Sequence, residues 1–433
     1  MSHQKDHPGL FSIILIGLIG NVMEWYDFAV YGYFAGVLGK LFFPSTDPGL
    51  SLIASFGAFA AGFLMRPLGG LLFGRIGDAL GRQAAMTLSV LAMAIPTVLM
   101  ACLPTYDQIG IFAPLALVLL RIIQGLSVGG EYTSSLVYLA ENSPENRRAF
   151  TAIWGSWGAV FGMVLGSGVG LLTATLLGNE ILEAWGWRIP FAIGGAVALA
   201  GFMIRRRMPE EIPREPEKAP VMTILKNYRS HISRIALINL GSGVAYYTVF
   251  VYAVTYIRNI DHFSETVALE LNTASMLVLL VALPLAAWLS DRFGRIRMVT
   301  VSVTALLLMA FPLFSMIHNS DLDQVLIAEI SFAFLVAMST GGMVALNVEL
   351  MPNDVRCTGL AVAYNLAHGI FGGTTPLIAA WLLKTSGNPI APAYWLVGAL
   401  AISAATLLFW IREDHIHPVI ELKSRAASRR SRS

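Results

Sequence analysis

Residues 74–82, Gly-Arg-Ile-Gly-Asp-Ala-Leu-Gly-Arg, end a long apolar run, and residues 287–295, Ala-Trp-Leu-Ser-Asp-Arg-Phe-Gly-Arg, end another one 213 residues later. Both stretches contain Asp-x-x-Gly-Arg. A second pattern, Glu-x-x-Pro-x-x-x-Arg, begins at Glu141 and again at Glu349, 208 residues later. Because the chain has 433 residues, both offsets are close to half of its length. The sequence therefore predicts two copies of one half, each copy ending its apolar segments in the same way.

The composition places the chain in a lipid bilayer. Hydrophobic residues make up 56% of it and charged residues only 13%, whereas soluble proteins have about 25% charged residues. The net charge of +2 is too small to indicate a nucleic-acid partner. Cys102 and Cys357 are expected near opposite membrane faces, which argues against a disulfide between them. The first apolar stretch has no cleavage site after a short core, so we expect a retained helix and not a signal peptide.

Apolar runs long enough to cross a bilayer, about 20 residues each, occur twelve times. Their predicted centres are residues 22, 62, 95, 126, 163, 197, 245, 278, 308, 338, 370 and 402. The sixth run is short, between Pro190 and Arg205. The longest polar break, 205–230, contains four prolines and lies near the chain midpoint. We therefore predict an all-α membrane protein with six-helix halves at 1–204 and 231–412, a linker at 205–230 and a basic tail at 413–433.

The distribution of Lys and Arg predicts the orientation of these spans. With both termini in the cytoplasm, cytoplasmic segments hold 23 of the 29 basic residues and the outer loops hold four. The opposite orientation would reverse this bias and break the positive-inside rule. We expect a multi-pass protein of a bacterial inner membrane with both termini in the cytoplasm. The basic tail then lies along the anionic inner leaflet or is a disordered end without a further role.

The repeated motifs are candidates for gating. The first motif falls where span two meets span three and, in its second copy, where span eight meets span nine. Ion pairs at one face of a moving bundle hold one state closed and release it in another. The Glu and Arg of the second motif are the expected partners within each half. An ordinary interfacial salt bridge is the alternative, but two motif types repeated in the same order favour gating. The predicted gating residues are Asp78, Arg82, Glu141, Arg148, Asp291, Arg295, Glu349 and Arg356.

The two loops and the run Arg121-x-x-Gln124-Gly125 resemble the marks of the major facilitator superfamily, and the resemblance covers all twelve spans. It implies two six-helix halves that alternate access to a central cavity lined by spans one, four, seven and ten. The chain departs from the family pattern at three positions. Ala79 stands where a basic residue is usual, and Ala287 and Ser290 replace glycines.

A narrower resemblance is carried by four strings in the first half. They are Asn-Val-Met-Glu-Trp-Tyr-Asp-Phe at 21–28, Met-Arg-Pro-Leu-Gly-Gly at 65–70, Gly-Gly-Glu-Tyr at 129–132 and Trp-Gly-Trp-Arg-Ile-Pro at 185–190. These strings resemble the metabolite:proton symporter family, which includes carriers of citrate, 2-oxoglutarate, shikimate, and proline or betaine. Tyr364-Asn365 and Phe371-Gly372-Gly373 in the second half also fit.

Charged residues deep in the membrane are retained only when they are paired or face water. In the first half these are Glu24, Asp27, Arg66, Arg121 and Glu131. Polar residues at i, i+3, i+6 and i+10 give span one a polar side from Asn21 to Tyr31, and span four has a similar side. The proton-coupling candidates, in order, are Asp27, Glu131 and Glu24, because burial and a nearby Arg act on a carboxyl group in opposite directions. Permanent pairing with Arg66 or Arg121 is the alternative.

Arg121 is the leading substrate contact, since a guanidinium can hold a carboxylate through two parallel hydrogen bonds. Its alternative role is a structural ion pair, and Arg66 is assigned that structural role. The second half has one deep acid, Glu329, and several polar residues that can bind a solute. The predicted substrate-binding residues are Asn21, Tyr26, Arg121, Gln124, Tyr246, Tyr247, Tyr364 and Asn365. Glycines at 158, 162, 166 and 170 form a small-residue seam for close helix contact.

These features predict a proton-coupled symporter that imports a small carboxylate-bearing metabolite. An organic acid is the first choice, a zwitterionic osmolyte or amino acid such as betaine or proline the second, and drug export the least favoured. The sequence contains no His pair, Cys–His set or nucleotide loop of the kind an enzyme would need. We therefore expect no catalytic residue, metal or cofactor. The expected partners are the solute, protons and the lipid bilayer, with the protein as a monomer.

Overall fold

The computed structural model describes residues 9–46, 48–205, 221–259, 263, 265–318, 321–417 and 419. These residues are almost wholly helical and include no strand. Contacts divide the chain into unit 1, Met1–Tyr138 with Gly155–Pro216, and unit 2, Leu139–Trp154 with Glu217–Ser433. Most of the predicted linker, from 206 to 220, and most of the basic tail, at 418 and 420–433, lie outside the described residues.

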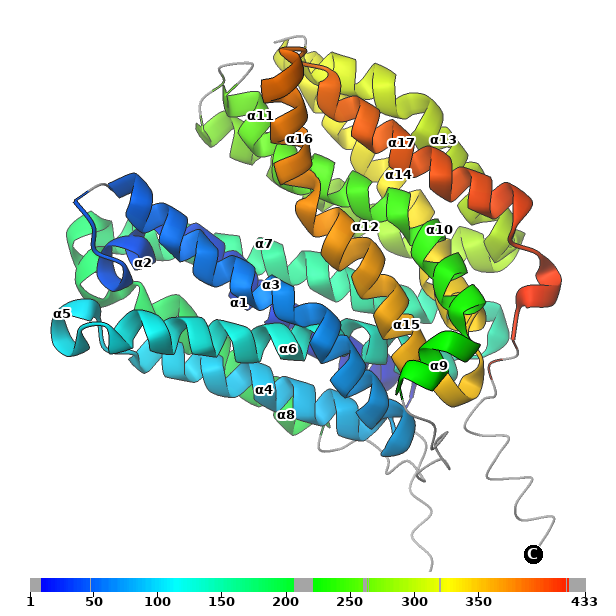
Figure 1. Cartoon of the computed structure of the whole chain (residues 1–433), viewed down its shortest axis with the longest axis horizontal. Helices are drawn as coiled ribbons and strands as arrows, with labels where there is room; N and C mark the ends of the chain where they lie inside the picture. Colours follow the sequence, from blue (N-terminus) through cyan, green and yellow to red (C-terminus); the bar gives the residue numbers. More distant parts are fainter. Residues whose placement is uncertain are drawn as a thin grey trace, which may run out of the picture. The chain divides into compact units, whose positions relative to one another are not determined.

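Unit 1 contains five long helices and three short helical elements, besides the greater part of α7. Helix α8 packs against α1 and α4, and α3 packs against α2 and α4 (Figure 1). The elements are α1 (Leu10–Tyr33), α2 (Ala35–Phe42), α3 (Pro48–Ala79), α4 (Arg82–Cys102), α5 (Tyr106–Ile109), α6 (Phe112–Glu141), α7 (Arg148–Ile181), the π-helical η2 (Leu182–Gly186) and α8 (Arg188–Arg205).

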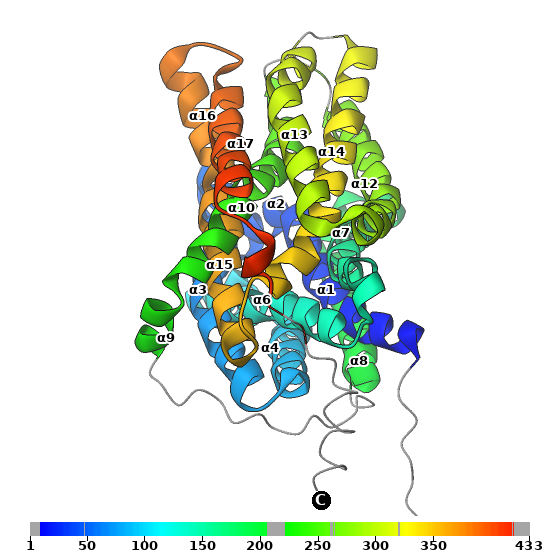
Figure 2. The same ribbon diagram turned by 90° about the vertical axis from the view of Figure 1, so that its right-hand side faces the viewer.

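Unit 2 takes the last turn of α6, the first turns of α7 and everything after the linker. Helix α14 packs against both α12 and α13, which run beside it in Figure 2. The elements are η1 (Glu145–Arg147), α9 (Val221–Asn227), α10 (Arg229–Tyr247), η3 (Thr248–Tyr252), α11 (Ala253–Asn259), α12 (Glu265–Phe293), α13 (Arg295–Ile317), α14 (Leu322–Glu349), η4 (Asn353–Val355), α15 (Arg356–Tyr364), η5 (Asn365–Gly372), α16 (Gly373–Ser386), α17 (Ala391–Phe409) and η6 (Glu413–His415).

Twelve helical stretches among the described residues are long and apolar enough to cross a membrane. Every predicted centre falls inside one of them, so the twelve-span prediction is confirmed. The sixth span is longer than expected. It begins at Leu182, because a π-helical turn continues the helix before Pro190.

The two Asp-x-x-Gly-Arg loops have the same backbone conformation. Gly81 has φ +96° and Gly294 has φ +95°, and each glycine caps the helix that follows it. A side chain is strained in this left-handed region, so the turn requires glycine. The repeat seen in the sequence is therefore also a repeat of the turn geometry. We refer to the helix ends that carry these loops as the motif end.

The glycine seam of α7 lies against α1. A Cβ atom added at Gly158, Gly162 or Gly166 would meet a backbone carbonyl of α1, that of Leu18, Val22 or Tyr26. Close backbone approach of this kind is the usual reason for small residues at four-residue spacing in membrane helices. The structural interpretation of the seam is confirmed.

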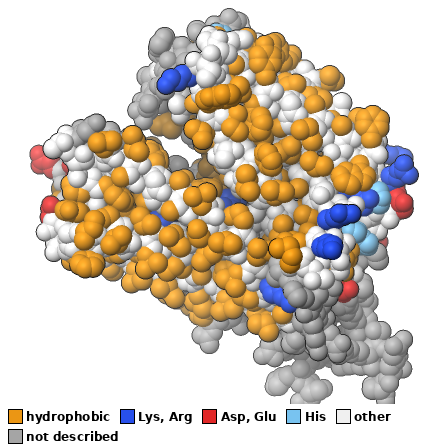
Figure 3. All heavy atoms as spheres, viewed as in Figure 1, with side chains coloured by type: hydrophobic (Ala, Val, Ile, Leu, Met, Phe, Trp, Pro, Cys, Tyr) orange, Lys and Arg blue, Asp and Glu red, His pale blue; other side chains and the backbone are white. Residues whose placement is uncertain are grey.

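The surface fits a bilayer. On the face shown in Figure 3, hydrophobic side chains cover most of the described surface, and charged side chains are few. Large apolar residues such as Leu64, Leu176, Val281 and Phe409 are more than 70% exposed. Exposure of this extent is costly in water and normal in lipid.

Candidate functional site

The polar side of α1 is buried inside unit 1. Asn21, Glu24, Asp27 and Tyr31 are each at most 1% exposed. They lie on the side of α1 away from the α7 seam, because residues 18, 22 and 26 occupy the opposite side of the helix. The predicted stripe is therefore an interior one, and each of its polar groups needs a partner or a function.

Asp27 forms an ion pair with Arg121 of α6, and both of its carboxylate oxygens accept hydrogen bonds. Nη1 of Arg121 donates to Oδ2 of Asp27 at 2.6 Å and to Oε1 of Gln124 at 2.6 Å. Nε2 of Gln124 donates to the same Asp27 oxygen at 3.1 Å, and Thr97 Oγ1 donates to the other oxygen at 2.8 Å. Three side chains from α4 and α6 thus satisfy this carboxylate.

The Arg121 guanidinium also lies among aromatic rings. Its central carbon is 4.1 Å from the ring centre of Tyr31, 5.0 Å from that of Phe28 and 5.5 Å from that of Phe59. Such contacts stabilise a cation out of water. Its second amino group, Nη2, is buried and has no hydrogen-bond acceptor among the described residues. One amino group of the guanidinium is therefore used, and contacts within the described chain leave the other unsatisfied, which calls for an explanation.

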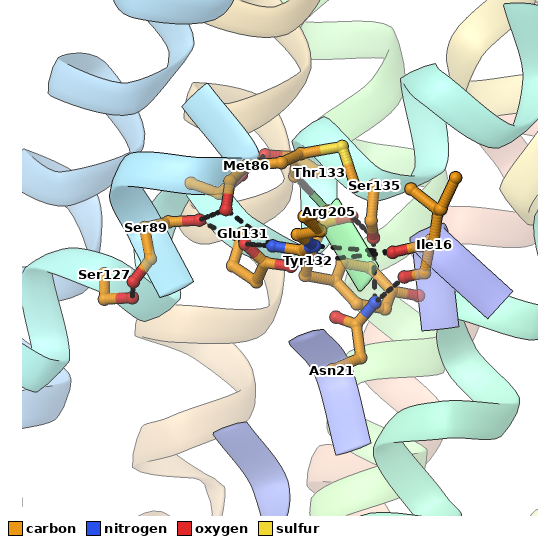
Figure 4. Close-up of polar contacts among 12 residues, drawn as sticks. Ile16, Asn21, Met86, Ser89, Ser127, Glu131, Tyr132, Thr133, Ser135 and Arg205 are labelled. Carbon is orange, nitrogen blue, oxygen red and sulfur yellow. Dashed lines mark hydrogen bonds and ion pairs between the residues drawn. The ribbon is translucent and has the colours of Figure 1, made fainter. Parts of the chain in front are cut away.

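Glu131 of α6 forms a second ion pair, with Arg205 at the end of α8. Arg205 donates from both amino groups to the Glu131 carboxylate, and Ser89 donates to it as well (Figure 4). Arg205 also donates to the backbone carbonyl of Met86 at 2.6 Å. A Cβ added at Gly20 would overlap both partners, so α1 passes the pair only because this residue has no side chain.

Sequence reasoning missed Arg205. It was assigned to the linker beginning at 205, as the first of three consecutive arginines, but it is the last residue of α8 and is fully buried. The sequence did contain a signal for a further base. It placed three acids and only two bases deep in the first half, which left one acid without a base to pair with. Arg205 brings the interior of unit 1 to three acids and three bases.

Glu24 differs from the other two acids. It is 1% exposed, and neither carboxylate oxygen has a hydrogen-bond partner among the described residues. Arg66, Glu131 and Arg205 are the charged groups near enough to act on it electrostatically. Nε of Arg66 is likewise buried without an acceptor in the described part of the chain. Arg66 reaches this position because Gly129 lets the α3 backbone lie directly against α6.

The remaining substrate-binding candidates of unit 1 have partners within the fold. Asn21 donates to Ser135 Oγ at 2.8 Å (Figure 4) and to the carbonyl of Gly17 at 3.0 Å. The hydroxyl of Tyr26 donates to the carbonyl of Pro190 at 2.8 Å, which ties α1 to α8. Tyr26 is fully buried in an apolar cluster, so its geometry favours a structural role.

The other four candidates lie in unit 2, near two π-helical segments. Tyr364 stacks on His368 of η5, with ring centres 4.1 Å apart, and Tyr246 lies 5.1 Å from Phe250 of η3. Tyr247 packs against Gly372, and Asn365 donates to the carbonyl of Ala361 at 2.8 Å. π-helical turns often occur at functional sites.

Unit 2 has a buried neutral polar pair. The side-chain amides of Asn239 on α10 and Asn347 on α14 exchange two hydrogen bonds, of 2.7 and 3.0 Å. The acid predicted to be deep in this half, Glu329, is 1% exposed, and neither of its carboxylate oxygens has a hydrogen-bond partner among the described residues.

The gating candidates form two groups, one at the motif end of each unit. In unit 1, Arg82 bonds Asp78 at 3.0 Å. In unit 2, the second motif pairs crosswise and not within each half: Arg148 bonds Glu349 at 2.7 Å, and Arg356 bonds Glu141 at 3.2 Å. Partners within each half were expected from the sequence. The sequence gives no sign of pairs that cross between the halves, because their residues are more than 200 positions apart.

Unit 2 also joins the two motif types to each other. Arg295 bonds Glu349 at 2.8 Å and the carbonyl of Glu145 at 2.6 Å. The carboxylate of Asp291 accepts hydrogen bonds from the backbone N–H groups of Ala149 and Phe150, at 3.0 and 2.8 Å. These N–H groups belong to the first turn of α7, where the helix dipole favours an anion.

Comparison with known proteins identifies the family. The chain is 36% identical to a glycine betaine/proline/ectoine/pipecolic acid transporter of Dickeya dadantii, over 93% of this chain and 84% of the relative. It is 35% identical to a proline/betaine transporter of Escherichia coli K12, over 93% and 83%. The family model for sugar and other transporters matches residues 13–214, and that of the major facilitator superfamily matches residues 235–432.

The chain belongs to the major facilitator superfamily. Among solved structures, the proton:xylose symporter XylE bound to a bromodeoxyglucose matches this facilitator with a TM-score of 0.78 over 96% of the chain and 98% of its own length. At 20% identity this likeness concerns the fold alone. The family resemblance and the fold predicted from the sequence are confirmed, and the chain is a transporter and not an enzyme. The relatives' names support the second choice of solute, a zwitterion, better than the organic acid.

Proposed function

We propose that this protein is a proton-coupled importer of a small zwitterionic osmolyte or amino acid, working by alternating access in a bacterial inner membrane. The relatives' names support the solute class, and the bacterial relatives and twelve apolar spans support the location. The Lys and Arg bias supports an orientation with both termini and the motif end in the cytoplasm.

The observation that carries this proposal is that the two amino groups of the Arg121 guanidinium have different contacts. One amino group binds Asp27, and the other is buried without an acceptor in the described structure. A solute carboxylate can take the second amino group and form a charge-assisted hydrogen bond there. Aromatic rings around the guanidinium exclude water, which strengthens that bond.

The same arrangement supplies proton coupling through Asp27. An ionised Asp27 competes with the solute carboxylate for Arg121, whereas a protonated Asp27 does not. Proton binding therefore raises the affinity for solute, and bound solute favours the protonated acid by the same factor. This is the sign that symport requires. Gln124 and Thr97 hold the released carboxyl group in place, since both also bond to it.

The crosswise ion pairs of unit 2 suit the role of a gate. Arg148 and Glu141 come from the segment that joins α6 to α7, and Glu349 and Arg356 from the matching segment of the second half. Breaking these pairs separates segments that are distant in the sequence, as a change of access requires. Each pair is buried, so loss of one partner leaves an uncompensated charge.

Transport by purified protein in liposomes tests the proposal. With an inward proton gradient, labelled glycine betaine or proline should accumulate above its external concentration, and a protonophore should abolish the accumulation. Asp27→Asn should retain exchange of solute across the membrane and lose gradient-driven accumulation. Accumulation that persists after the gradient collapses would rule out symport. Uptake of citrate or 2-oxoglutarate without uptake of betaine or proline would restore the organic-acid interpretation.

A further inference from the structure

The deep charges of unit 1 leave one acid and one base without a direct partner. Two pairs are closed, Asp27 with Arg121 and Glu131 with Arg205. Both carboxylate oxygens of Glu24 and Nε of Arg66 are buried without a hydrogen-bond partner in the described structure. Buried charges of this kind are retained where a ligand or a proton completes them.

We propose that Glu24 binds the cationic nitrogen of the solute. This inference rests on the proposed function, in which Arg121 holds the solute carboxylate. Glu24 and Arg121 are each 1% exposed. Among the described residues, the Glu24 oxygens have no hydrogen-bond partner, so they can bind a cationic nitrogen. Nη2 of Arg121 has no acceptor there, so it can donate to a carboxylate.

Glu24 and the acid that holds Arg121 lie close together along α1, which suits a short zwitterion. Glu24 lies three residues before Asp27, the residue that holds Arg121, so the two acids are separated by roughly 4.5 Å along the α1 axis. A solute whose nitrogen and carboxylate are one or two carbon atoms apart can span positions about one helical turn apart. A dicarboxylate of the same length would place an acid against Glu24, which disfavours it.

Aromatic rings on the same side of the helix favour an alkylated nitrogen. Phe28 follows Glu24 by four residues and is its neighbour on the α1 surface. Its ring centre lies 5.4 Å from that of Phe59 and 5.1 Å from that of Phe63. The guanidinium carbon of Arg121 already lies 5.0 Å from the ring centre of Phe28 and 5.5 Å from that of Phe59, and the guanidinium carbon of Arg66 lies 5.4 Å from the ring centre of Phe63. The parts of these rings that the two arginines leave uncovered can contact an alkylated nitrogen bound by Glu24.

A matched pair of ligands tests the inference directly. Glycine betaine and 3,3-dimethylbutanoate have the same shape and carboxylate, and differ only in a positive nitrogen against a neutral carbon. Calorimetric binding to detergent-purified wild type should favour betaine by at least tenfold. In Glu24→Gln the preference should fall below threefold through weaker betaine binding, with binding of 3,3-dimethylbutanoate retained. Glu329→Gln, which removes a buried carboxylate in unit 2, should keep the full preference.

The outcomes separate this inference from the proposed function. If Arg121→Gln weakens both ligands but Glu24→Gln keeps the tenfold preference, the role of Glu24 is overturned and the proposed function stands. The same holds if Glu24→Gln removes only the pH dependence of binding, because Glu24 would then be the coupling acid. If wild type binds neither betaine nor proline, the proposed function itself fails.

Chemical protection provides a measurement that needs no variant. Dicyclohexylcarbodiimide modifies carboxyl groups in apolar surroundings, and mass spectrometry of the α1 peptide reports the modification of Glu24. Saturating betaine should slow this labelling at least fivefold, and 3,3-dimethylbutanoate should slow it much less. Equal labelling with and without betaine would overturn the inference even if Glu24→Gln does not fold.

Discussion

The two units carry the same motifs at their ends and different chemistry in their interiors. Gly81 and Gly294 have φ angles within 1° of each other. Yet unit 1 encloses the ion pairs of Asp27 and Glu131 away from its motif, whereas unit 2 pairs two neutral amides, Asn239 and Asn347, and buries the acid Glu329. Duplication thus preserved the turns that a moving frame needs, and among the described residues the buried ion pairs away from the motifs lie in one copy. The comparison teaches that repeat symmetry predicts the frame and that departures from it point to the site.

The largest effect should follow loss of Arg205, because the charged interior of unit 1 depends on it. Arg205→Leu leaves Glu131 buried without its partner and should destabilise the protein by about 3–5 kcal/mol. Thermal unfolding in detergent measures the loss. Arg205→Lys, which retains the charge, should lose less. A melting temperature of Arg205→Leu equal to that of wild type would show that the unit 1 interior does not depend on this pair.

Loss of Arg121 should affect binding more than stability. Arg121→Gln removes a charged donor to the solute carboxylate, worth about 1.5–3 kcal/mol, so solute affinity should fall tenfold or more. The protein should still insert and purify, because Gln124 and Thr97 continue to bond Asp27. Isothermal titration with betaine or proline checks the affinity. Unchanged affinity would remove Arg121 from the site.

The two motif turns should respond alike to the same substitution. A side chain held at positive φ with extended ψ costs about 1–3 kcal/mol, so Gly81→Ala and Gly294→Ala should reduce stability by similar amounts. Thermal unfolding of the two variants side by side provides the measurement. If only one variant lost stability, the similar φ angles of Gly81 and Gly294 would not imply similar backbone strain.

The neutral pair of unit 2 should contribute little. Hydrogen bonds between membrane helices average about 0.6 kcal/mol in double-mutant cycles. A cycle of Asn239→Ala and Asn347→Ala should therefore give a coupling energy near that value, unchanged between pH 5 and pH 8. A coupling energy of several kcal/mol would contradict the contrast between a charged and a neutral interior.

The smallest effect concerns the chain after α17. The backbone N–H of His417 donates to the backbone carbonyl of Glu349 at 2.7 Å, and its ring Nε2 lies 3.2 Å from Nε2 of His231. Burial, then nearby Arg356, Arg234 and His415, lower the pKa of His417 below its ordinary 6.5. The unfolded chain thus binds this proton at higher pH, so the stabilising contribution is complete above about pH 6.5 and decreases as pH falls through the depressed value.

Hydrogen exchange of residues 413–417 measures this attachment. Protection should weaken below about pH 6.5 in wild type, and His417→Gln should remove most of that pH dependence. The same pH dependence in wild type and His417→Gln would assign the change to another group.

The sequence was sufficient for the helices and insufficient for the pairings. Twelve apolar runs and the Asp-x-x-Gly-Arg turns predicted the spans and their ends, because these depend on local hydrophobicity and on glycine. The partner of Arg148 is Glu349, 201 residues away, and no local pattern encodes that distance. Arg205 looked like a linker residue because it begins a polar run, although its side chain turns back into the helices. The ranking of Asp27, Glu131 and Glu24 as proton-coupling candidates also depended on ion-pair partners that only the fold brings together.

The glycines of α7 have a consequence for the genetics of this transporter. By fitting against the carbonyls of Leu18, Val22 and Tyr26, they fix the azimuth of α1 about its own axis. Rotation of α1 by one residue, 100°, would carry Glu24 and Asp27 away from α6. Substitutions at Gly162, which has no functional group, should therefore appear in a loss-of-transport screen beside substitutions of the acids themselves.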